Sequence, residues 1–506
     1  MLPASPSLTI VVASTGQRQP LLADLAAAAP QCVRDEVELI VARADTPAGL
    51  VELATAFPQT RFIGAPPATD LAELRSLGFA GAKGDVVALM NHTDDHGPAH
   101  DRWLSELRRR CSLHRCRRTS TETAAEVGAM LPHPLLSVVV PVHQGADVLP
   151  QSLTALTRSD LPRQRWELIV VDDASTDETA RIAARFADVV VRLPGKPHGT
   201  AYARNRGFEF TRGECVAFID ADVAVHPDTL ARFALVLARE PQVSAVFGTF
   251  DSCPGAAGLV AKYRTLRLRY YHQENAGIAE TFRASCGALR STVFASVGMF
   301  DEWHFPRHGV EDFELGHRLR QDGHRIVMRP DIQAAHLKCW TLRETIAADL
   351  RDRVVPWMRL FDRRAVARTR RKDRLRTVKQ VNTALTWLAL VLTLAWLRAD
   401  WPPLLLTAGM CTAVVLRNLL PQHRFFMRHS GHAFALAAVP LELLSYLVNG
   451  VAVVVGWLSR QLLGEPKPHP RVEAFAEMGV RTWPPVPSRR ADPIQQPPPA
   501  TLGRSA

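Results

Sequence analysis

The stretch ECVAFIDADVAVHPDTL (214–230) places two carboxylates directly after an apolar strand. Residues 215–219 are apolar, and Asp220 and Asp222 follow them on either side of Ala221. Asp is common where strands end because its side chain bonds nearby backbone amides, so a turn is one interpretation. The other is a metal site. In an extended segment the two carboxylates lie on one side and repel each other unless a cation binds between them. Mg²⁺ or Mn²⁺ accepts one or two carboxylates and takes its other ligands from water and phosphate.

From residue 135 onward, apolar strand patterns alternate with helical patterns. We expect strands at 135–142, 166–175, 188–193 and 215–219, and helices at 147–159, 176–187 and 199–211. Strands rich in β-branched residues that alternate with helices predict a mostly parallel α/β sheet. Ligands of such sheets bind beyond the carboxyl ends of the strands. Asp172, Asp173, Asp220 and Asp222 all fall at such ends, so one crevice can collect them.

The first 130 residues repeat this pattern weakly. VELIVARAD (37–45) matches WELIVVDDA (166–174), and residues 72–98 match residues 201–227, both at an offset of 129. Identical pairs include Glu38 with Glu167, Arg75 with Arg204, Gly78 with Gly207, Gly84 with Gly213, and Pro98 with Pro227.

The acidic residues are not repeated in this first part. Arg43 stands opposite Asp172, and Asn91-His92-Thr93 stands opposite Asp220-Ala221-Asp222. The pattern indicates a duplicated fold that lost its metal and nucleotide groups, or a chance likeness between two α/β sheets. In either case we assign no chemistry to residues 1–130 and expect a packing or dimerising role.

Most of the net charge of +11 lies in one short stretch of the 506 residues. Residues 351–380 hold twelve Lys or Arg against three Asp. Three apolar segments follow at 383–397, 402–416 and 433–458, with Glu442 as the one charge within them. Long apolar segments without amphipathic spacing and with Trp near their ends are typical of membrane helices, which need roughly 17–25 residues. A soluble helical domain is the alternative.

The basic stretch also predicts an orientation. Lys and Arg accumulate on the cytoplasmic side of membrane helices, so the residues before 381 are expected in the cytoplasm. The same stretch can bind anionic lipid headgroups. We expect two or three spans, since Glu442, Pro440 and the pair Asn449-Gly450 could make the last segment re-entrant.

Other parts of the chain add little chemistry. The N-terminus shows no signal-peptide pattern. CSLHRC (111–116) has no second Cys/His pair at zinc spacing, so we expect the eight cysteines to be free thiols in a reducing compartment. The Pro-rich residues 461–506 are expected to be disordered.

Several motifs follow one another in a fixed order between residues 135 and 345. They are SVVVPVHQG, VVDDASTDET, GTAYARNRG, AFIDADV, SCGALR (285–290), GMFDE (298–302) and VEDFELGHRLRQDGHRI (310–326). Each is weak alone, but in this order the chain resembles a family-2 glycosyltransferase with the type-A nucleotide-binding fold. The resemblance implies an α/β fold with a Rossmann-like, mostly parallel sheet. It also implies transfer of a sugar from a nucleotide donor to an acceptor hydroxyl, with inversion at the anomeric carbon.

The resemblance implies a donor site at the strand ends. Pro141, Val142, Asp172 and Asp173 would hold the nucleotide, with a carboxylate accepting a bond from a base N–H or a ribose hydroxyl. A strand-end cap is the alternative for the two acids. Arg204 could meet the diphosphate, or it could lie on a helix surface.

The resemblance also implies a divalent metal cofactor, Mg²⁺ or Mn²⁺. Asp220 and Asp222 match the family's Asp-x-Asp motif, so Asp222 would bind the metal directly. Asp220 would face the ribose or a metal-bound water. His336, in AAHLKCWTL (334–342), is expected to be a further metal ligand. The ion would neutralise the leaving diphosphate as a Lewis acid.

VEDFELGHRL matches the family's Glu-Asp motif and so implies a general base. Asp312 would take the proton from the acceptor hydroxyl, and Glu311 would orient the acceptor or the loop. Acids are also favoured in the first turn of a helix, so both residues could serve as a helix terminus.

The segment after His336 bears on the acceptor. Trp340 could stack on an acceptor sugar or pack on the membrane-facing side. Processive members of the family carry Gln-x-x-Arg-Trp here, whereas this chain has HLKCW, which favours a single transfer.

These features predict five segments. They are a degenerate glycosyltransferase-like domain (1–130), a catalytic domain (134–350), a basic juxtamembrane segment (351–380), transmembrane helices (381–460) and a disordered tail (461–506). The expected protein is a multi-pass enzyme of the cytoplasmic membrane whose catalytic domain faces the cytoplasm. It would use a nucleotide-sugar donor and a lipid-linked or otherwise membrane-held glycan acceptor, in cell-envelope or extracellular polysaccharide assembly.

Three alternatives remain at this point. The chain could be a processive polysaccharide synthase, or a non-catalytic scaffold with a glycosyltransferase-like fold. A nucleic-acid partner is disfavoured because the basic stretch lacks interleaved aromatic residues and abuts an apolar segment.

Overall fold

The computed structural model describes residues 8–92, 135–360 and 374–464, apart from Gly16, Asp35, 252–257, 306–308 and Cys339. The CSLHRC segment, the Pro-rich tail and the middle of the basic stretch lie outside the described residues.

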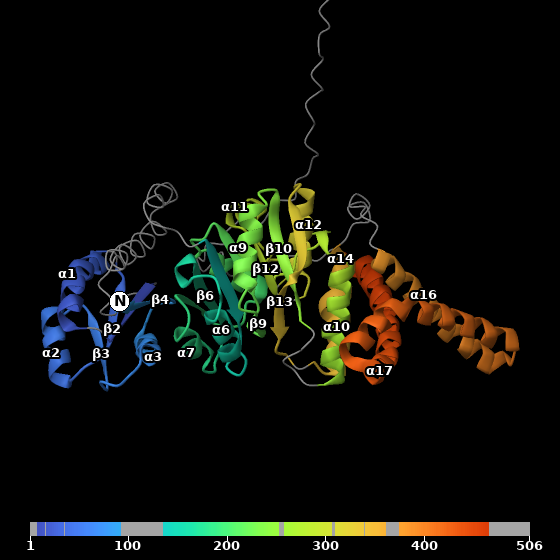
Figure 1. Cartoon of the computed structure of the whole chain (residues 1–506), viewed down its shortest axis with the longest axis horizontal. Coiled ribbons are helices and arrows are strands. Elements are labelled where there is room, and N and C mark those ends of the chain that lie inside the picture. The colour runs from blue at the N-terminus through green and yellow to red at the C-terminus, as the bar shows by residue number, and fades with distance from the viewer. Residues whose placement is uncertain are drawn as a thin grey trace, which may run out of the picture.

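Thirteen strands in the described part of the chain form one mixed sheet in the order β11-β13-β10-β12-β8-β5-β6-β7-β4-β1-β2-β3, with β9 paired to β13 (Figure 1). The first four strands are β1 (Leu8–Ser14), β2 (Glu38–Ala44), β3 (Arg61–Ala65) and β4 (Val86–His92). The others are β5 (Leu136–Val142), β6 (Trp166–Asp173), β7 (Val189–Leu193), β8 (Cys215–Ile219), β9 (Val223–Val225), β10 (Val243–Phe250), β11 (Gly277–Ala279), β12 (Cys286–Arg290) and β13 (Arg325–His336). The expected α/β class is confirmed.

The helices lie between these strands and after them. In the first part they are α1 (Arg18–Arg34), α2 (Pro47–Ala56) and α3 (Leu71–Gly81). In the second part they are α6 (Leu149–Thr157), α7 (Thr179–Ala184), α8 (Thr200–Phe208), α9 (Thr229–Arg239), α10 (Leu259–Glu274), α11 (Ser291–Ser296), α12 (Glu311–Gln321), α13 (Leu342–Ala347) and α14 (Val355–Leu360). The two C-terminal helices are α16 (Arg374–Ala399) and α17 (Pro402–Leu463).

The strands and helices expected from residue 135 to 219 are confirmed to within a few residues at each end. The largest difference is at 176–187, where helix α7 begins only at Thr179. A side-chain oxygen of Asp177 accepts a hydrogen bond from the backbone nitrogen of Thr179 at 3.1 Å, and this local turn takes the place of the first helical residues.

Strand directions place the carboxyl ends of β5, β6, β7, β8, β10 and β13 at one edge of the sheet. Strand β5 runs parallel to β6 and to β8. Strand β12 runs antiparallel to both β8 and β10, so β8 and β10 share a direction, and β10 runs parallel to β13. The edge formed by the ends of β5, β6, β8, β10 and β13 is therefore where a ligand site is expected.

Helices cover both faces of this part of the sheet. Leu153 of α6, Ala183 of α7 and Phe233 of α9 lie in one buried apolar cluster. Ala203 of α8, Phe294 of α11 and Leu315 of α12, all buried, lie in the cluster on the opposite face. Helices α8 and α12 therefore lie on the same face of the sheet.

The N-terminal strands continue the sheet formed by β5–β13. Strand β4 pairs antiparallel with β7, with Val86 opposite Val191, so the two halves share one sheet. The order β4-β1-β2-β3 matches the order β8-β5-β6-β7. The N-terminal half therefore packs through β4 against strand β7 of the second half of the same chain.

A buried polar network recurs in the two halves. Thr9 donates to Glu38 at 2.6 Å and accepts from the backbone nitrogen of Gly84 at 2.9 Å. Ser137 donates to Glu167 at 2.6 Å and accepts from the backbone nitrogen of Gly213 at 2.8 Å. The same hydroxyl, carboxylate and amide at matching positions favour a duplicated fold over a chance likeness.

Helices α16 and α17 are, within the described residues, long and apolar enough to cross a membrane by length and composition. Three short segments were expected from the sequence, but residues 402–463 form one helical stretch that breaks at Gly431, whose φ of 81° is left-handed. Helix α17 packs against α10, where Tyr263 and Leu266 share a buried apolar cluster with Phe426 and Ala435. Helix α17 therefore attaches directly to α10, and α16 packs against α17 (Figure 1).

Candidate active site

The predicted site residues come from strand ends and from the start of a helix at one edge of the sheet. Pro141 and Val142 end β5, and Asp172 and Asp173 end β6. Asp220 and Asp222 lie in the short connection between β8 and β9, and His336 ends β13. Glu311 and Asp312 begin α12, and Trp340 follows β13.

The two acids at the end of β6 have different surroundings. Asp173 accepts hydrogen bonds from the backbone nitrogens of His198 and Gly199, each at 2.8 Å, and lies 3.0 Å from His198 Nδ1. It fixes the loop that leads into α8. Asp172 accepts a bond from the backbone nitrogen of Ser175 at 3.1 Å. Burial raises the pKa of the Asp172 carboxyl group.

Asp220 is held by a buried arginine. Arg204 of α8 donates from Nη2 to Oδ1 of Asp220 at 2.7 Å and from Nη1 to Oε1 of Glu311 at 2.9 Å. The Arg204 side chain is only 1% exposed. Burial disfavours its charge, but the carboxylates of Asp220 and Glu311 outweigh burial and raise its pKa. Arg204 therefore joins the strand connection to helix α12, and the helix-surface position considered from the sequence is wrong.

Asp222 and His336 come together across two strand ends. Nε2 of His336 lies 3.9 Å from Oδ2 of Asp222. Burial lowers the pKa of His336, although Asp222 and Asp220 oppose that shift. The imidazole is thus favoured in its neutral form, which is the form that binds metals.

The chemistry of these residues fits a divalent cation. Bonds of about 2.0–2.2 Å from one ion to a carboxylate oxygen and to an imidazole nitrogen can span the distance between Asp222 and His336. No cluster of three or more His, Cys, Asp or Glu side chains in the described ranges is arranged to hold a metal alone. Water and phosphate oxygens would have to complete the coordination, as they do for Mg²⁺ in nucleotide sites.

Asp312 lies in the first turn of α12. Its Oδ1 accepts a bond from the backbone nitrogen of Phe313 at 2.8 Å, and its Oδ2 lies 4.0 Å from Nη1 of Arg283. Val310, at the N-cap, makes no side-chain cap, so the acids of the first turn face the positive end of the helix. Both surroundings place positive charge beside this carboxylate.

The indole ring of Trp340 is close to two cations. The guanidinium carbon of Arg264 lies 4.0 Å from the ring centroid, and Nζ of Lys338 lies 4.3 Å from it. These contacts connect the segment after β13 to helix α10, so the ring is available to a sugar only where these cations leave a face open.

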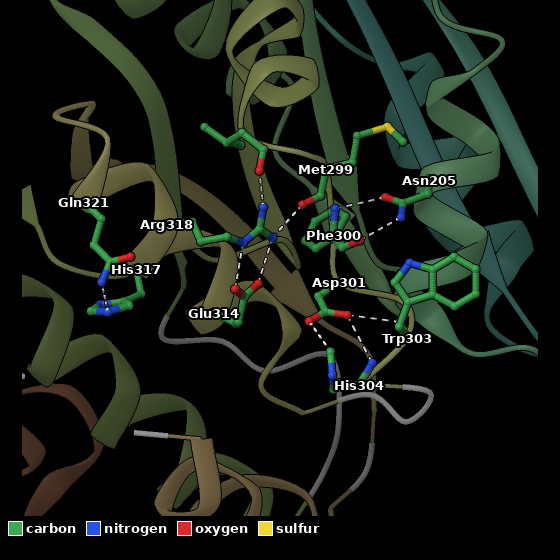
Figure 2. A network of polar contacts seen from close by, with 11 residues as sticks. Asn205, Met299, Phe300, Asp301, Trp303, His304, Glu314, His317, Arg318 and Gln321 are labelled. Carbon is green, nitrogen blue, oxygen red and sulfur yellow. Dashed lines mark hydrogen bonds and ion pairs between the residues drawn. The ribbon is translucent and has the colours of Figure 1, made fainter. Parts of the chain in front are cut away.

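A loop between α11 and α12 makes hydrogen bonds to both α8 and α12 (Figure 2). Asn205 bonds both the carbonyl oxygen of Phe300, at 2.8 Å, and its backbone nitrogen, at 3.1 Å. Arg318 of α12 donates to the carbonyl oxygen of Met299 at 2.6 Å and to Glu314 at 2.6 Å. The helix that carries Asp312 is therefore fixed at more than one point.

Two residues near the site were not predicted from the sequence. His198, directly before GTAYARNRG, contacts Asp173. Arg283, two residues before the SCGALR motif, lies beside Asp312 and over the ring of Phe313. The adjoining motifs marked both neighbourhoods, but the contacts depend on how the loops fold.

Residues 137–296 match the family model described as Glycosyl transferase family 2. Among curated proteins, the probable glycosyltransferase YdaM of Bacillus subtilis is 27% identical over 212 residues, which are 39% of this chain and 49% of the relative. Glycosyltransferase AglE of Haloferax volcanii is 33% identical over 103 residues, 20% of this chain and 34% of the relative. The poly(ribitol-phosphate) beta-N-acetylglucosaminyltransferase TarS of Staphylococcus aureus is 32% identical over 98 residues, 19% of this chain and 17% of the relative. The chain thus covers half or less of the length of these relatives.

Among solved structures, a mannosyltransferase from Pyrobaculum calidifontis in complex with GDP-Man and Mn²⁺ is 19% identical, with a TM-score of 0.41. The alignment covers 67% of this chain and 93% of that chain. The family match and the sheet described above agree with the type-A fold expected from the motifs.

Proposed function

We propose, from the premise that residues 137–296 are a family 2 glycosyl transferase domain, that this protein transfers a sugar from a nucleotide-diphospho-sugar to an acceptor hydroxyl, with inversion at the anomeric carbon. One observation carries the proposal. Asp172, the pair of Asp222 and His336, and Asp312 come from separate elements and gather at one edge of the sheet.

The donor would bind across the ends of β5, β6 and β8. Pro141 and Val142 would line the base pocket, and the buried carboxylate of Asp172 would accept a hydrogen bond from the base or the ribose. Asp173 would act indirectly, because its oxygens hold the backbone of His198 and Gly199.

Asp222 and His336 would hold a Mg²⁺ or Mn²⁺ ion, with Asp220 nearby. When bound, this ion supplies positive charge that stabilises the departing diphosphate. Asp312 would accept the proton of the acceptor hydroxyl as its oxygen attacks the anomeric carbon from the face opposite the diphosphate. Glu311 would hold the start of α12 in place.

The acceptor is proposed to be a membrane-held glycan. The contact between α10 and α17 keeps the catalytic crevice attached to two helices that can cross a membrane. Attachment of enzyme and acceptor to one membrane raises the effective concentration of the acceptor. The name of the Staphylococcus relative, which acts on poly(ribitol-phosphate), supports a cell-envelope polymer as the acceptor class. The basic residues around 351–380 support a cytoplasmic position for the catalytic half.

A single transfer is favoured over processive synthesis, because this chain has HLKCW where processive members of the family carry Gln-x-x-Arg-Trp. The length of the product separates the two activities. One added sugar per acceptor supports our proposal, and a ladder of longer products contradicts it.

The proposal is tested by donor hydrolysis across a panel of UDP- and GDP-sugars with Mn²⁺, using the full-length protein in detergent. We expect turnover of one donor and loss of that turnover in Asp222→Ala. Asp331→Ala is the matched control, because Asp331 pairs with Arg232 on the surface, outside the crevice. Equal hydrolysis by Asp222→Ala and wild type would show that the metal assignment is wrong. Absence of nucleotide-sugar binding by the wild type would favour a non-catalytic scaffold.

A further inference from the structure

Arg204 links three elements of the catalytic half that are far apart in the sequence. It lies on α8 and bonds Asp220, after β8, and Glu311, at the start of α12. The second oxygen of Glu311 accepts a bond from the backbone nitrogen of Gly309 at 2.7 Å. Both carboxylate oxygens of Glu311 are therefore engaged, and they hold the chain at the entry to α12.

The surroundings of Arg204 leave little room for a ligand. Its side chain is 1% exposed, and its guanidinium carbon lies 5.2 Å from the centroid of the Phe300 ring. Both of its Nη atoms already donate to carboxylates. A donor diphosphate could reach this guanidinium only after the pairs with Asp220 and Glu311 had opened.

The N-terminal half offers an internal comparison. Arg75 occupies the matching position on α3, 129 residues earlier. It donates to Asn91, which stands where Asp220 stands in the catalytic half, at 3.3 Å. It also donates to the carbonyl oxygens of Ala184, at 3.1 Å, and of Ala187. Even in the half without the acidic motif, the arginine at this position connects chain segments.

We propose that Arg204 is a positioning residue that ties the metal-binding end of the crevice to Glu311 and so places the general base Asp312, and that it is not a ligand of the donor diphosphate. This inference rests on the proposed function. Its physical basis is the charge balance, since one guanidinium compensates two carboxylates that would repel each other in a buried site. Without the bridge, the start of α12 loses the bond that fixes Glu311, and the neighbouring Asp312 moves with it.

The test compares Arg204→Lys with wild type and with Arg75→Lys as the matched control. A lysine keeps the charge but cannot span two carboxylates with separate nitrogens of one planar group. We expect kcat to fall about 100-fold in Arg204→Lys, because misplacement of a catalytic group by 1 Å has an effect of that size. Binding of the nucleoside diphosphate, measured by calorimetry with Mn²⁺, should stay within about threefold of wild type. Arg75→Lys should lower the melting temperature and leave kcat unchanged.

A second measurement does not depend on activity. Amide hydrogen exchange at residues 309–313 should be faster in Arg204→Lys and also in Glu311→Gln, and unchanged in Arg75→Lys. Weaker binding of nucleoside diphosphate by tenfold or more, with unchanged kcat and unchanged exchange at 309–313, would overturn the inference and assign Arg204 to the diphosphate. If the wild type binds no nucleotide sugar, the proposed function fails, and exchange at 309–313 alone decides whether Arg204 positions α12.

Discussion

Replacement of Glu302 by glutamine should make this protein less sensitive to alkaline pH. Glu302 is buried and accepts a hydrogen bond from Asn205 at 2.7 Å, and it lies 3.6 Å from Arg206. Burial raises its pKa to about 7 despite these partners. A glutamine has nearly the same shape and can still accept the bond from Asn205. Arg206 keeps its other partner, Glu209, at 2.7 Å.

The sign and size of the effect follow from the pKa. The folded protein holds the Glu302 proton up to about pH 7, whereas the unfolded chain releases it near the ordinary value of 4.5. Between these values the folded state binds more protons, so its stability falls as pH rises. The difference of about 2.5 pKa units at 1.36 kcal/mol per unit corresponds to about 3 kcal/mol over the whole window. Between pH 5 and pH 8 we expect the free energy of unfolding of the wild type to fall by about 2–3 kcal/mol relative to that of Glu302→Gln.

The assay is thermal unfolding of the full-length protein in detergent, at pH 5 and at pH 8. The melting temperature of Glu302→Gln relative to wild type should rise by roughly 5 °C between the two pH values. Glu209→Gln is the control, because this carboxylate pairs with the same arginine but is more exposed. A difference between Glu302→Gln and wild type that stays constant from pH 5 to pH 8 would refute the reasoning.

Three further predictions concern the base, the packing of α8 and the attachment of α17. Asp312→Asn should reduce sugar transfer by about 10²–10⁴-fold with donor binding retained, and loss of donor binding would contradict its assignment as the base. Gly207→Ala should lower stability by about 1–3 kcal/mol in chemical denaturation, because the added Cβ would lie 2.5 Å from a methyl carbon of Val139; an unchanged midpoint would show that α8 can shift freely. Arg267 lies 3.5 Å from the buried carboxylate of Glu442. Glu442→Ala removes this carboxylate and should lower the free energy of unfolding by about 3–5 kcal/mol. The double variant with Arg267→Met should recover much of the lost melting temperature, and a double variant no more stable than Glu442→Ala would contradict the pairing.

The strand ends that carry Asp172 and Asp222 could be predicted because they depend on local pattern. Runs of β-branched residues followed by acids predict strands that end in polar groups. The observed strands β6 and β8 agree with that prediction. Because the carboxyl ends of parallel strands lie at the same side of a sheet, these acids could be expected close together before the packing was known.

The roles of Asp173 and Arg204 could not be predicted in the same way. Both stand in motifs that suggested contact with the donor, yet Asp173 bonds the loop at His198, and Arg204 bonds Asp220 and Glu311. A motif shows that a polar group stands near the crevice, but it does not show which protein groups already satisfy it.

The sequence by itself determined the alternation of strands and helices, the acids at the strand ends, and the long apolar segments near the C-terminus. These depend on periodicity and composition over a few turns of chain. Only the tertiary structure decided that β4 pairs with β7 to join the two halves in one sheet, and that Arg204 connects α8 to α12. Such pairings join residues about one hundred positions apart, so they depend on how whole layers pack and not on any local pattern.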